Sequence, residues 1–459
     1  MQSSLNASSL REFISSENKE KLREICTGTH PADLSTFLAE LEPAEVWAVL
    51  KTCDPDLQIE IFGHLEVDQQ VELSETMSKK ELADFLTEMP PDERVDLVQR
   101  LPPQKREIVL GAMAKAERED IRRLSSYEEE TAGAVMTSDY ISLSPTLTTA
   151  EAIAKIRLEA PDKETIYYAY VLDGLRRLIG FVSLKDLILA MPETQIADIM
   201  NRQTIYARAT DDQEVAARMI QKYDLLALPV VNGNNVLVGI VTYDDAMDII
   251  TQEQTEDIEK LMAIRGSHEP GMYMRTSSWG HFRKRVVWIV ILAGLGMISG
   301  FIVQSFEGLL LQFAVLATFM PMLADTGGNT GSQAATLVVR ALALEEIKPR
   351  DIFRVIYKEL KVALPLGLVL SALAFARVAF FAGGSSLPEG VTPTLVGVAV
   401  SAALGLQVVT STMIGALLPM TAARFKMDPA VVASPALTTV VDITGLFLYF
   451  MIVKMILGV

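Results

Sequence analysis

The sequence predicts a multidomain membrane protein in which an acidic, soluble part precedes an apolar part with five transmembrane helices. Half of the 459 residues are hydrophobic, and the longest apolar stretches lie near the C-terminus. Charge divides the chain at the same place. Residues 283–459 hold 13 Lys and Arg against 9 Asp and Glu, so with −17 overall residues 1–282 carry a net −21. Two internal repeats, one helical and one mixed α/β, organise the soluble part.

This composition excludes several classes of function. A net charge of −21 repels phosphate backbones, so we expect no nucleic-acid binding. The two cysteines, Cys26 and Cys53, cannot build a disulfide framework or a thiolate metal site, and we expect them in the core of a reduced, cytosolic domain. The polar N-terminus does not read as a signal peptide. We find no catalytic triad, paired catalytic carboxylates or phosphate loop, so we expect no enzyme.

The helical repeat covers residues 41–113, where an apolar residue recurs every twelve positions. Proline follows four of these residues by two positions, and proline suits the first turn of a helix but not its interior. Each unit is therefore predicted to be one short helix, and the stack of them a solenoid-like domain over residues 1–130; a plain helical bundle is the alternative. The repeated residues are Leu41, Cys53, Leu65, Met77, Met89, Leu101 and Met113, with Pro43, Pro55, Pro91 and Pro103.

The α/β repeat occupies residues 131–200 and 201–250. Each copy predicts a hairpin with a turn glycine, Gly174 or Gly233, followed by a helix that Ser183 or Thr242 caps. This pattern resembles a tandem pair of CBS domains. The resemblance implies binding of an adenine nucleotide such as ATP, with Asp186 and Asp245 holding the ribose. The alternative is that both acids simply follow a helix cap.

A connecting helix is predicted from residue 246 toward the membrane, within a segment that extends to residue 280. Its acids Glu253, Glu256 and Asp257 follow one another at helical spacing and share a face. An uncompensated acidic triplet costs stability, so we expect a cation there.

Five membrane spans are predicted within residues 281–459. Eleven Lys and Arg lie in connections on one side and only Arg377 and Lys454 on the other, which places the N-terminus in the cytosol and the C-terminus outside. An odd number of spans makes an inverted repeat within one chain awkward and favours a pathway shared by two chains. The spans are Val286–Gln304, Leu309–Val339, Val362–Phe381, Thr394–Met420 and Pro429–Leu457.

Two carboxylates lie within these spans, where an unpaired charge is costly and usually functional. Asp442 is near the middle of the last span, and no Lys or Arg lies at mid-membrane depth to balance it. Its alternative role is a buried carboxyl hydrogen-bonded by Thr438. Asp325 precedes the polar segment Thr326–Gln333, whose glycines predict a helix break or a close backbone contact.

The order of these parts resembles the MgtE family of magnesium channels. The local matches are Thr326–Gln333, Gly415–Pro419, Asp428–Ala430 and Asp442–Gly445. The resemblance implies a homodimer in the cell membrane whose second and fifth spans line one pore, with Asp442 from both subunits binding the ion near Gly328, Asn329 and Thr438. Asp325 lies outside the shared pattern.

The resemblance also implies regulatory Mg²⁺ between the cytosolic domains in a closed state, so that internal Mg²⁺ closes the pore and the connecting helix acts as a plug. A CBS-regulated transporter of another solute, including Mn²⁺ or Co²⁺, and a membrane-tethered nucleotide or metal sensor are the alternatives. The implied regulatory residues are Asp92, Asp96, Asp212, Glu214, Asp224, Asp245, Asp248, Glu253, Glu256 and Asp257, with Glu60 as a weaker match.

Overall fold

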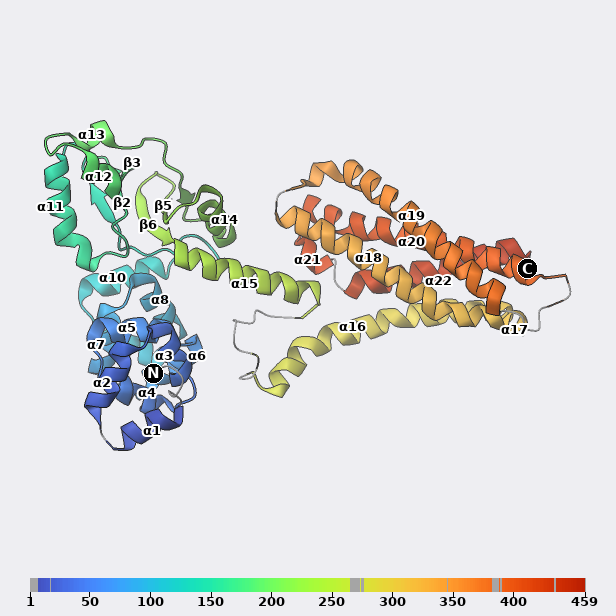
Figure 1. The fold of residues 1–459 in the computed structure, drawn as a ribbon, viewed down its shortest axis with the longest axis horizontal. Helices are drawn as coiled ribbons and strands as arrows, with labels where there is room; N and C mark the ends of the chain where they lie inside the picture. Colours follow the sequence, from blue (N-terminus) through green and yellow to red (C-terminus); the bar gives the residue numbers. More distant parts are fainter. Residues whose placement is uncertain are drawn as a thin grey trace. The chain divides into compact units, whose positions relative to one another are not determined.

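The fold was analysed in a computed structural model, which describes residues 7–16, 18–264, 273, 276–344, 346–381, 388, 390–432 and 435–458. The chain divides into two compact units, Met1–Thr251 and Gln252–Val459 (Figure 1).

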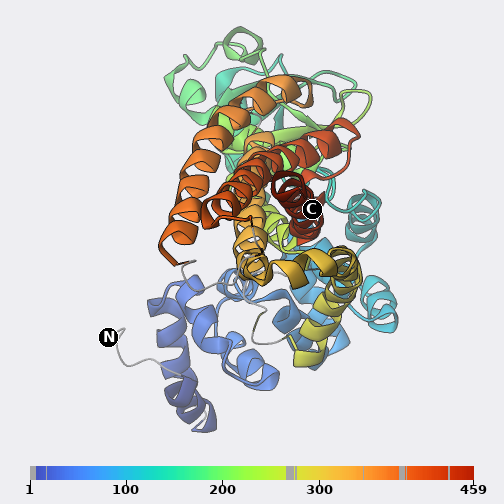
Figure 2. The same cartoon turned by 90° about the vertical axis from the view of Figure 1, so that its right-hand side faces the viewer.

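In the described residues up to 124, ten short helices form the N-terminal part of the first unit, and they lie one beside the next (Figures 1 and 2). Each is 8–10 residues long, and the described chain turns after each one. They are α1 (Ala7–Ser15), α2 (Lys19–Gly28), α3 (Pro31–Leu38), α4 (Pro43–Leu50), α5 (Pro55–Gly63), α6 (Val67–Thr76), α7 (Lys79–Glu88), α8 (Pro91–Arg100), α9 (Pro103–Leu110) and α10 (Lys115–Leu124).

The twelve-residue period produces this array. Helices α4, α5, α8 and α9 each begin at one of the predicted prolines, whose missing N–H costs nothing in a first turn. All seven repeated apolar residues, from Leu41 to Met113, are at most 7% exposed. From α3 to α10, each helix packs against the helix two positions further along, as α4 does on α6 and α6 on α8. The predicted solenoid-like domain is therefore confirmed.

Two three-stranded sheets follow, one in each α/β repeat. In both, the first strand pairs parallel to the second, and the second pairs antiparallel to the third across a tight turn. Asp173 and Asn232 accept backbone N–H groups at equivalent turn positions, which confirms the duplicated hairpin. The elements are β1 (Ile141–Leu143), α11 (Thr149–Glu159), β2 (Tyr168–Leu172), β3 (Leu178–Ser183), α12 (Leu184–Leu189), α13 (Ile196–Ile199), β4 (Ala207–Arg208), α14 (Gln213–Tyr223), β5 (Ala227–Val231) and β6 (Leu237–Thr242).

The predicted connecting helix is α15 (Tyr243–Leu261), one continuous helix that crosses the boundary between the units at Thr251. Residues 265–272 and 274–275 of the predicted linker lie outside the described residues.

The second unit is helical. Within the described residues, four helices are long and apolar enough to cross a membrane: Ser278–Ser305, Pro349–Phe380, Pro393–Arg424 and Pro435–Leu457. A fifth, α18, has 24 residues and is more polar because it contains the Thr326–Gln333 segment. The elements are α16 (Ser278–Ser305), α17 (Glu307–Gln312), the 3₁₀ turn η3 (Ala314–Phe319), α18 (Met320–Ala343), α19 (Ile352–Phe381), α20 (Pro393–Arg424), α21 (Pro429–Val432) and α22 (Pro435–Leu457).

The predicted second span is indeed interrupted, but not at its glycines. The break lies at Phe313–Phe319, where α17 ends and a 3₁₀ turn leads into α18. Gly327, Gly328 and Gly331 are inside the continuous helix α18, and all three are buried. The helix survives there because its glycines face other helices closely, and this packing offsets their weak helix propensity.

Candidate functional site

Close helix packing brings α18, α20 and α22 together. A β-carbon at Gly331 would lie 3.3 Å from the backbone oxygen of Ser411 and 3.3 Å from Val441 Cγ2, and one at Gly415 would overlap the Gly331 carbonyl. Small residues thus let the backbones of α18 and α20 approach until no side chain fits between them. Of the two predictions for the glycine segment, close backbone contact is correct and a helix break is wrong.

The predicted pore residues gather along α18 and α22. A β-carbon at Gly328 would lie 3.0 Å from Thr438 Cγ2, so the two helices nearly touch there. Asp442 follows Thr438 by one helical turn, and its Oδ1 is buried without a hydrogen-bond partner among the described residues. The alternative role, in which Thr438 donates a hydrogen bond to the carboxyl group, is therefore not observed for this oxygen. Asn329 is exposed on α18, as is Asp325 one turn before it.

A second concentration of acids lies inside the first unit, where α8 faces residues of the α/β repeats. Burial raises the pKa of Asp92 well above its usual value, and the negative charges of Asp245 and Glu164 raise it further. Burial, together with neighbouring carboxylates, raises the pKa of Glu93 to about 7 and that of Glu164 to about 7. The buried Arg94 of α8 instead donates to the carbonyls of Met89 and Thr87.

The same acidic region extends onto the start of α15. Burial is the main cause that raises the pKa of Asp245 and of Asp248, and Asp244 adds a like charge beside both. His64, at the end of α5, opposes the shift at Asp248. We define the acidic junction as Asp92, Glu93, Glu164, Asp244, Asp245 and Asp248.

The other predicted regulatory residues of this unit do not form one cluster with the acidic junction. Asp96 is exposed on α8, although its charge acts on Glu93, and Glu60 is exposed on α5. Asp212 caps α14 by accepting the backbone N–H of Glu214, and Glu214 forms an ion pair with Arg218. Asp224 ends the same helix with a left-handed φ of 51°. Local structural roles account for these last three positions.

The second unit contains the rest of the predicted acidic face, Glu253, Glu256 and Asp257 on α15. The expected cation is a side chain of the same helix. Lys260 Nζ lies 2.8 Å from Glu256 and 2.9 Å from Asp428, which precedes α21. Leu261 packs against the apolar cluster of α18 and α22 that includes Val339. Lys260 therefore supplies a positive charge beside Glu256, where the sequence predicts a cation.

The two acids predicted to hold a ribose take part in helix caps. Asp186 accepts from the Ser183 hydroxyl at 2.6 Å and from its N–H, and Asp245 accepts the same groups of Thr242. A separate pocket between the repeats does not include either acid. Aromatic Tyr168, Tyr170 and Phe181 line it, and so does Thr204, whose hydroxyl is buried without a partner among the described residues.

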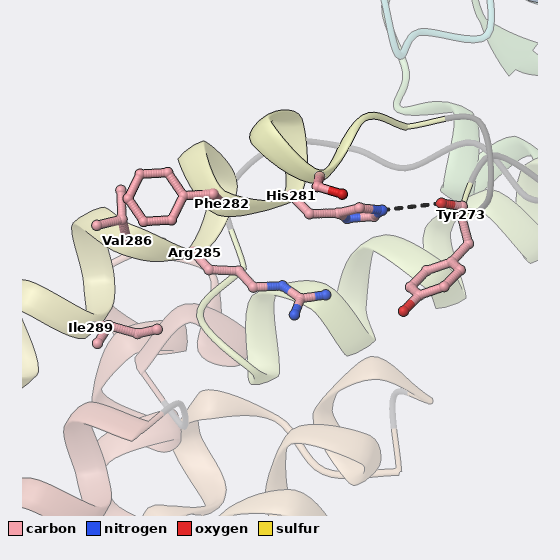
Figure 3. A pocket seen from close by; sticks show the side chains of 7 residues that line it. Tyr273, His281, Phe282, Arg285, Val286 and Ile289 are labelled. Carbon is pink, nitrogen blue, oxygen red and sulfur yellow. Dashed lines mark hydrogen bonds between the residues drawn. The ribbon is translucent and has the colours of Figure 1, made fainter.

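A further pocket lies at the beginning of α16 (Figure 3). His281 Nε2 is 3.1 Å from the carbonyl oxygen of Tyr273, and Figure 3 shows the Arg285 guanidinium on the same helix. Apolar side chains such as Val286 and Ile289 form much of the wall, and no carboxylate lines the described pocket. It therefore lacks the hard oxygen ligands that Mg²⁺ requires.

Sequence reasoning missed four residues that these sites include. Three of them, Glu93, Glu164 and Asp244, belong to the acidic junction, but they come from separate segments that only the fold brings together; Glu93 and Glu164 are 71 positions apart. Gln407 is 1% exposed in the middle of α20, and an isolated amide in an apolar span was the signal that could have revealed it. Across the described residues, no three Asp, Glu, His or Cys side chains converge to form a ready-made metal site.

Comparison with protein families divides the chain into the same parts. Residues 320–452 match the family described as a divalent cation transporter, MgtE, and residues 29–130 match the MgtE intracellular N domain. Residues 132–193 and 196–252 each match the CBS domain, which confirms the predicted CBS pair.

Curated relatives extend this similarity over most of the chain. The magnesium transporter MgtE of Thermus thermophilus is 42% identical over 341 residues, which cover 74% of this chain and 73% of that protein. The magnesium transporter MgtE of Bacillus subtilis is 37% identical over the same shares. That of Enterococcus faecalis is 34% identical over 74% of this chain and 72% of its own length.

Two solved structures resemble the soluble part. The crystal structure of the soluble part of a magnesium transporter is 33% identical, with a TM-score of 0.51, and covers 54% of this chain and 97% of that one. The structure of the cytosolic domain of the Mg²⁺ channel MgtE in complex with ATP is 36% identical in sequence, with a TM-score of 0.51. The match covers 53% of this chain and 99% of that chain.

Proposed function

This chain belongs to the MgtE family of divalent cation transporters, and on that premise we propose that it carries Mg²⁺ through the membrane past Asp442. The observation that carries the proposal is the carboxylate itself. Its Oδ1 is buried and without a partner among the described residues, and it lies on α22 one turn from the contact between Gly328 and Thr438. A buried carboxylate of this kind is costly unless a cation balances it.

The chemistry of the ligands favours Mg²⁺ in a hydrated form. Mg²⁺ takes oxygen ligands in octahedral geometry and dehydrates reluctantly, so a pore binds it best through retained waters. A single Asp442 supplies one negative charge. We therefore propose a homodimer in which Asp442 of each subunit faces one pore, so that two carboxylates balance the +2 ion. The exposed Asn329, with Gly328 and Thr438, would line this path.

Family membership confirms the prediction of a transporter rather than an enzyme. The apolar helices place the chain in a membrane that it crosses several times. We propose the cell membrane, with the N-terminus in the cytosol, because Lys and Arg concentrate in the connections on that side. The C-terminus would then lie outside.

We also propose that internal Mg²⁺ regulates the pore through the acidic residues of the soluble part. The acidic junction supports this, because its carboxylates raise one another's pKa and a divalent cation would relieve that repulsion. The remaining proposed ligands of regulatory Mg²⁺ in this unit are Asp96, Asp212, Glu214, Asp224 and Glu60. On α15, Glu253, Glu256 and Asp257 would bind Mg²⁺ next to Asp428 (which Lys260 contacts here). Closure at high internal Mg²⁺ then gives negative feedback.

ATP is the proposed regulatory ligand of the CBS pair. The cytosolic domain of the Mg²⁺ channel MgtE, which resembles this soluble part, forms a complex with ATP. The pocket between the repeats suits a nucleobase, because Tyr168 and Phe181 offer aromatic surface and Thr204 an unmet hydroxyl. Asp186 and Asp245 stay candidates for the ribose, although each caps a helix here.

The transport proposal is tested with the full chain in proteoliposomes. Asp442→Asn preserves the size of the side chain and removes its charge, so divalent uptake should fall by more than tenfold while the protein still assembles. Glu307→Gln, which removes an exposed carboxylate at the start of α17, should leave uptake unchanged. Wild-type uptake by Asp442→Asn would refute the assignment. Offering Mg²⁺, Mn²⁺ and Co²⁺ in turn distinguishes Mg²⁺ from the alternative ions.

A further inference from the structure

Gln407 joins three helices of the second unit. Its side chain extends from α20, and its Nε2 donates a hydrogen bond to the backbone oxygen of Leu323 on α18 at 2.9 Å. A β-carbon at Gly327 on α18, or at Gly445 on α22, would overlap this amide. The side chain therefore fills a slot that two glycines leave open between α18 and α22, and it has 1% of its surface exposed.

Packing alone does not explain an amide in this slot. Gln407 Oε1 is buried, and no described residue donates a hydrogen bond to it. An unsatisfied polar atom is costly in an apolar environment, and more so where the surroundings are lipid. A methionine of similar length would fill the slot without that cost. What an amide adds is the bond to Leu323, which ties α20 to the backbone of α18.

This slot adjoins the proposed ion path on both of its helices. Gly327 is next to Gly328, which contacts Thr438, and Gly445 follows Asp442 by three residues on α22. The amide thus occupies the space between Gly327 of α18 and Gly445 of α22, beside the residues that would meet the ion. Pores discriminate among cations by the spacing of their ligands and by the hydration shell they admit.

We propose that Gln407 is a positioning residue of the ion path, which sets how well the pore distinguishes Mg²⁺ from larger divalent cations. This inference rests on the proposed transport function. Gln407 acts on the ion through the spacing of Gly328 and Asp442 and does not itself bind the ion.

The test measures Mg²⁺ and Ca²⁺ uptake by the reconstituted full chain. Gln407→Met keeps length and removes the hydrogen bond, so the Mg²⁺ to Ca²⁺ uptake ratio should fall by about two- to tenfold, the range expected for one lost hydrogen bond between neutral groups. Thr412→Val is the matched control, since Thr412 is equally buried on α20 but its hydroxyl bonds Val408 O of the same helix. It should keep the wild-type ratio.

A wild-type ratio in assembled Gln407→Met would overturn the inference, and so would an equal loss in Thr412→Val. If Gln407→Met does not assemble, Gln407→Leu makes the same test, because it removes the amide donor without adding a charge. Gly445→Ala should lower the ratio as well, because its methyl group would overlap the Gln407 amide and displace it. A wild type that takes up neither ion would overturn the transport function and, with it, this inference.

Discussion

The acidic junction makes the stability of the soluble part depend on pH, and Mg²⁺ should remove that dependence. In the folded unit the pKa of Glu93 and that of Glu164 are each about 7, raised first by burial, against an ordinary value of 4.5. Below about pH 4.5 both groups are protonated in folded and unfolded chains, so they cost nothing. As the pH rises from about 4.5 to about 7, only the unfolded chain loses these protons readily. Stability should therefore fall across this window and level off above it.

The size of the effect follows from the number of protons involved. Two groups would retain about two protons in the folded state, but both side chains also reach solvent, which screens their interactions. We therefore expect the folded state to hold about one proton more than the unfolded state. This difference corresponds to about 1.4 kcal/mol of unfolding free energy per pH unit in the steepest part of the window.

Thermal unfolding of a fragment comprising residues 1–264 measures this directly. Without Mg²⁺, the melting temperature should be lower at about pH 8 than at about pH 5.5, and millimolar Mg²⁺ should raise it more at the higher pH. The double variant Glu93→Gln, Glu164→Gln should lose most of the pH dependence, whereas Glu72→Gln, an exposed acid of α6, should retain it. A fragment whose stability increases from pH 5.5 to 8 without Mg²⁺ would refute the reasoning.

Three further predictions concern other contacts. Lys260→Met removes the ammonium between Glu256 and Asp428, so the full chain should melt at a lower temperature and regain stability in millimolar Mg²⁺; no recovery would argue against a cation site there. Gly415→Ala should destabilise the second unit by about 1–3 kcal/mol, because its methyl group overlaps Gly331 O, and an unchanged denaturation midpoint would contradict the close packing. Millimolar ATP should raise the melting temperature of the soluble fragment, and Thr204→Val should reduce that shift if the described pocket holds the nucleotide.

The local features of this fold could be predicted from the sequence, because local rules determine them. Proline at the first turn and a twelve-residue apolar period place the short helices, and α5 begins at Pro55 as expected. The paired hairpins follow from turn residues such as Asp173 and Asn232. Long apolar stretches likewise indicate where the membrane helices lie, but not where they begin: α16 starts at Ser278 and α19 at Ile352, eight and ten residues before the predicted Val286 and Val362.

Contacts between distant segments could not be predicted in the same way. Glycine in a helix is compatible with a helix break or with close packing. At Gly327 the packing of α20 and α22 against α18 shows that close packing is the correct interpretation. The ion pair of Lys260 with Asp428 joins residues 168 positions apart. Glu164 became part of the acidic junction for the same reason. Burial and charge act through space, and residue spacing along the chain does not report them.

Mg²⁺ uptake by the wild-type chain at two internal Mg²⁺ concentrations tests the account most directly. Proteoliposomes are loaded either without Mg²⁺ or with millimolar Mg²⁺, and entry of external Mg²⁺ is followed with a Mg²⁺ isotope. The account predicts rapid uptake into vesicles without internal Mg²⁺ and strongly reduced uptake into the loaded ones. Absence of uptake in both would contradict transport, and equal, rapid uptake in both would contradict closure by internal Mg²⁺.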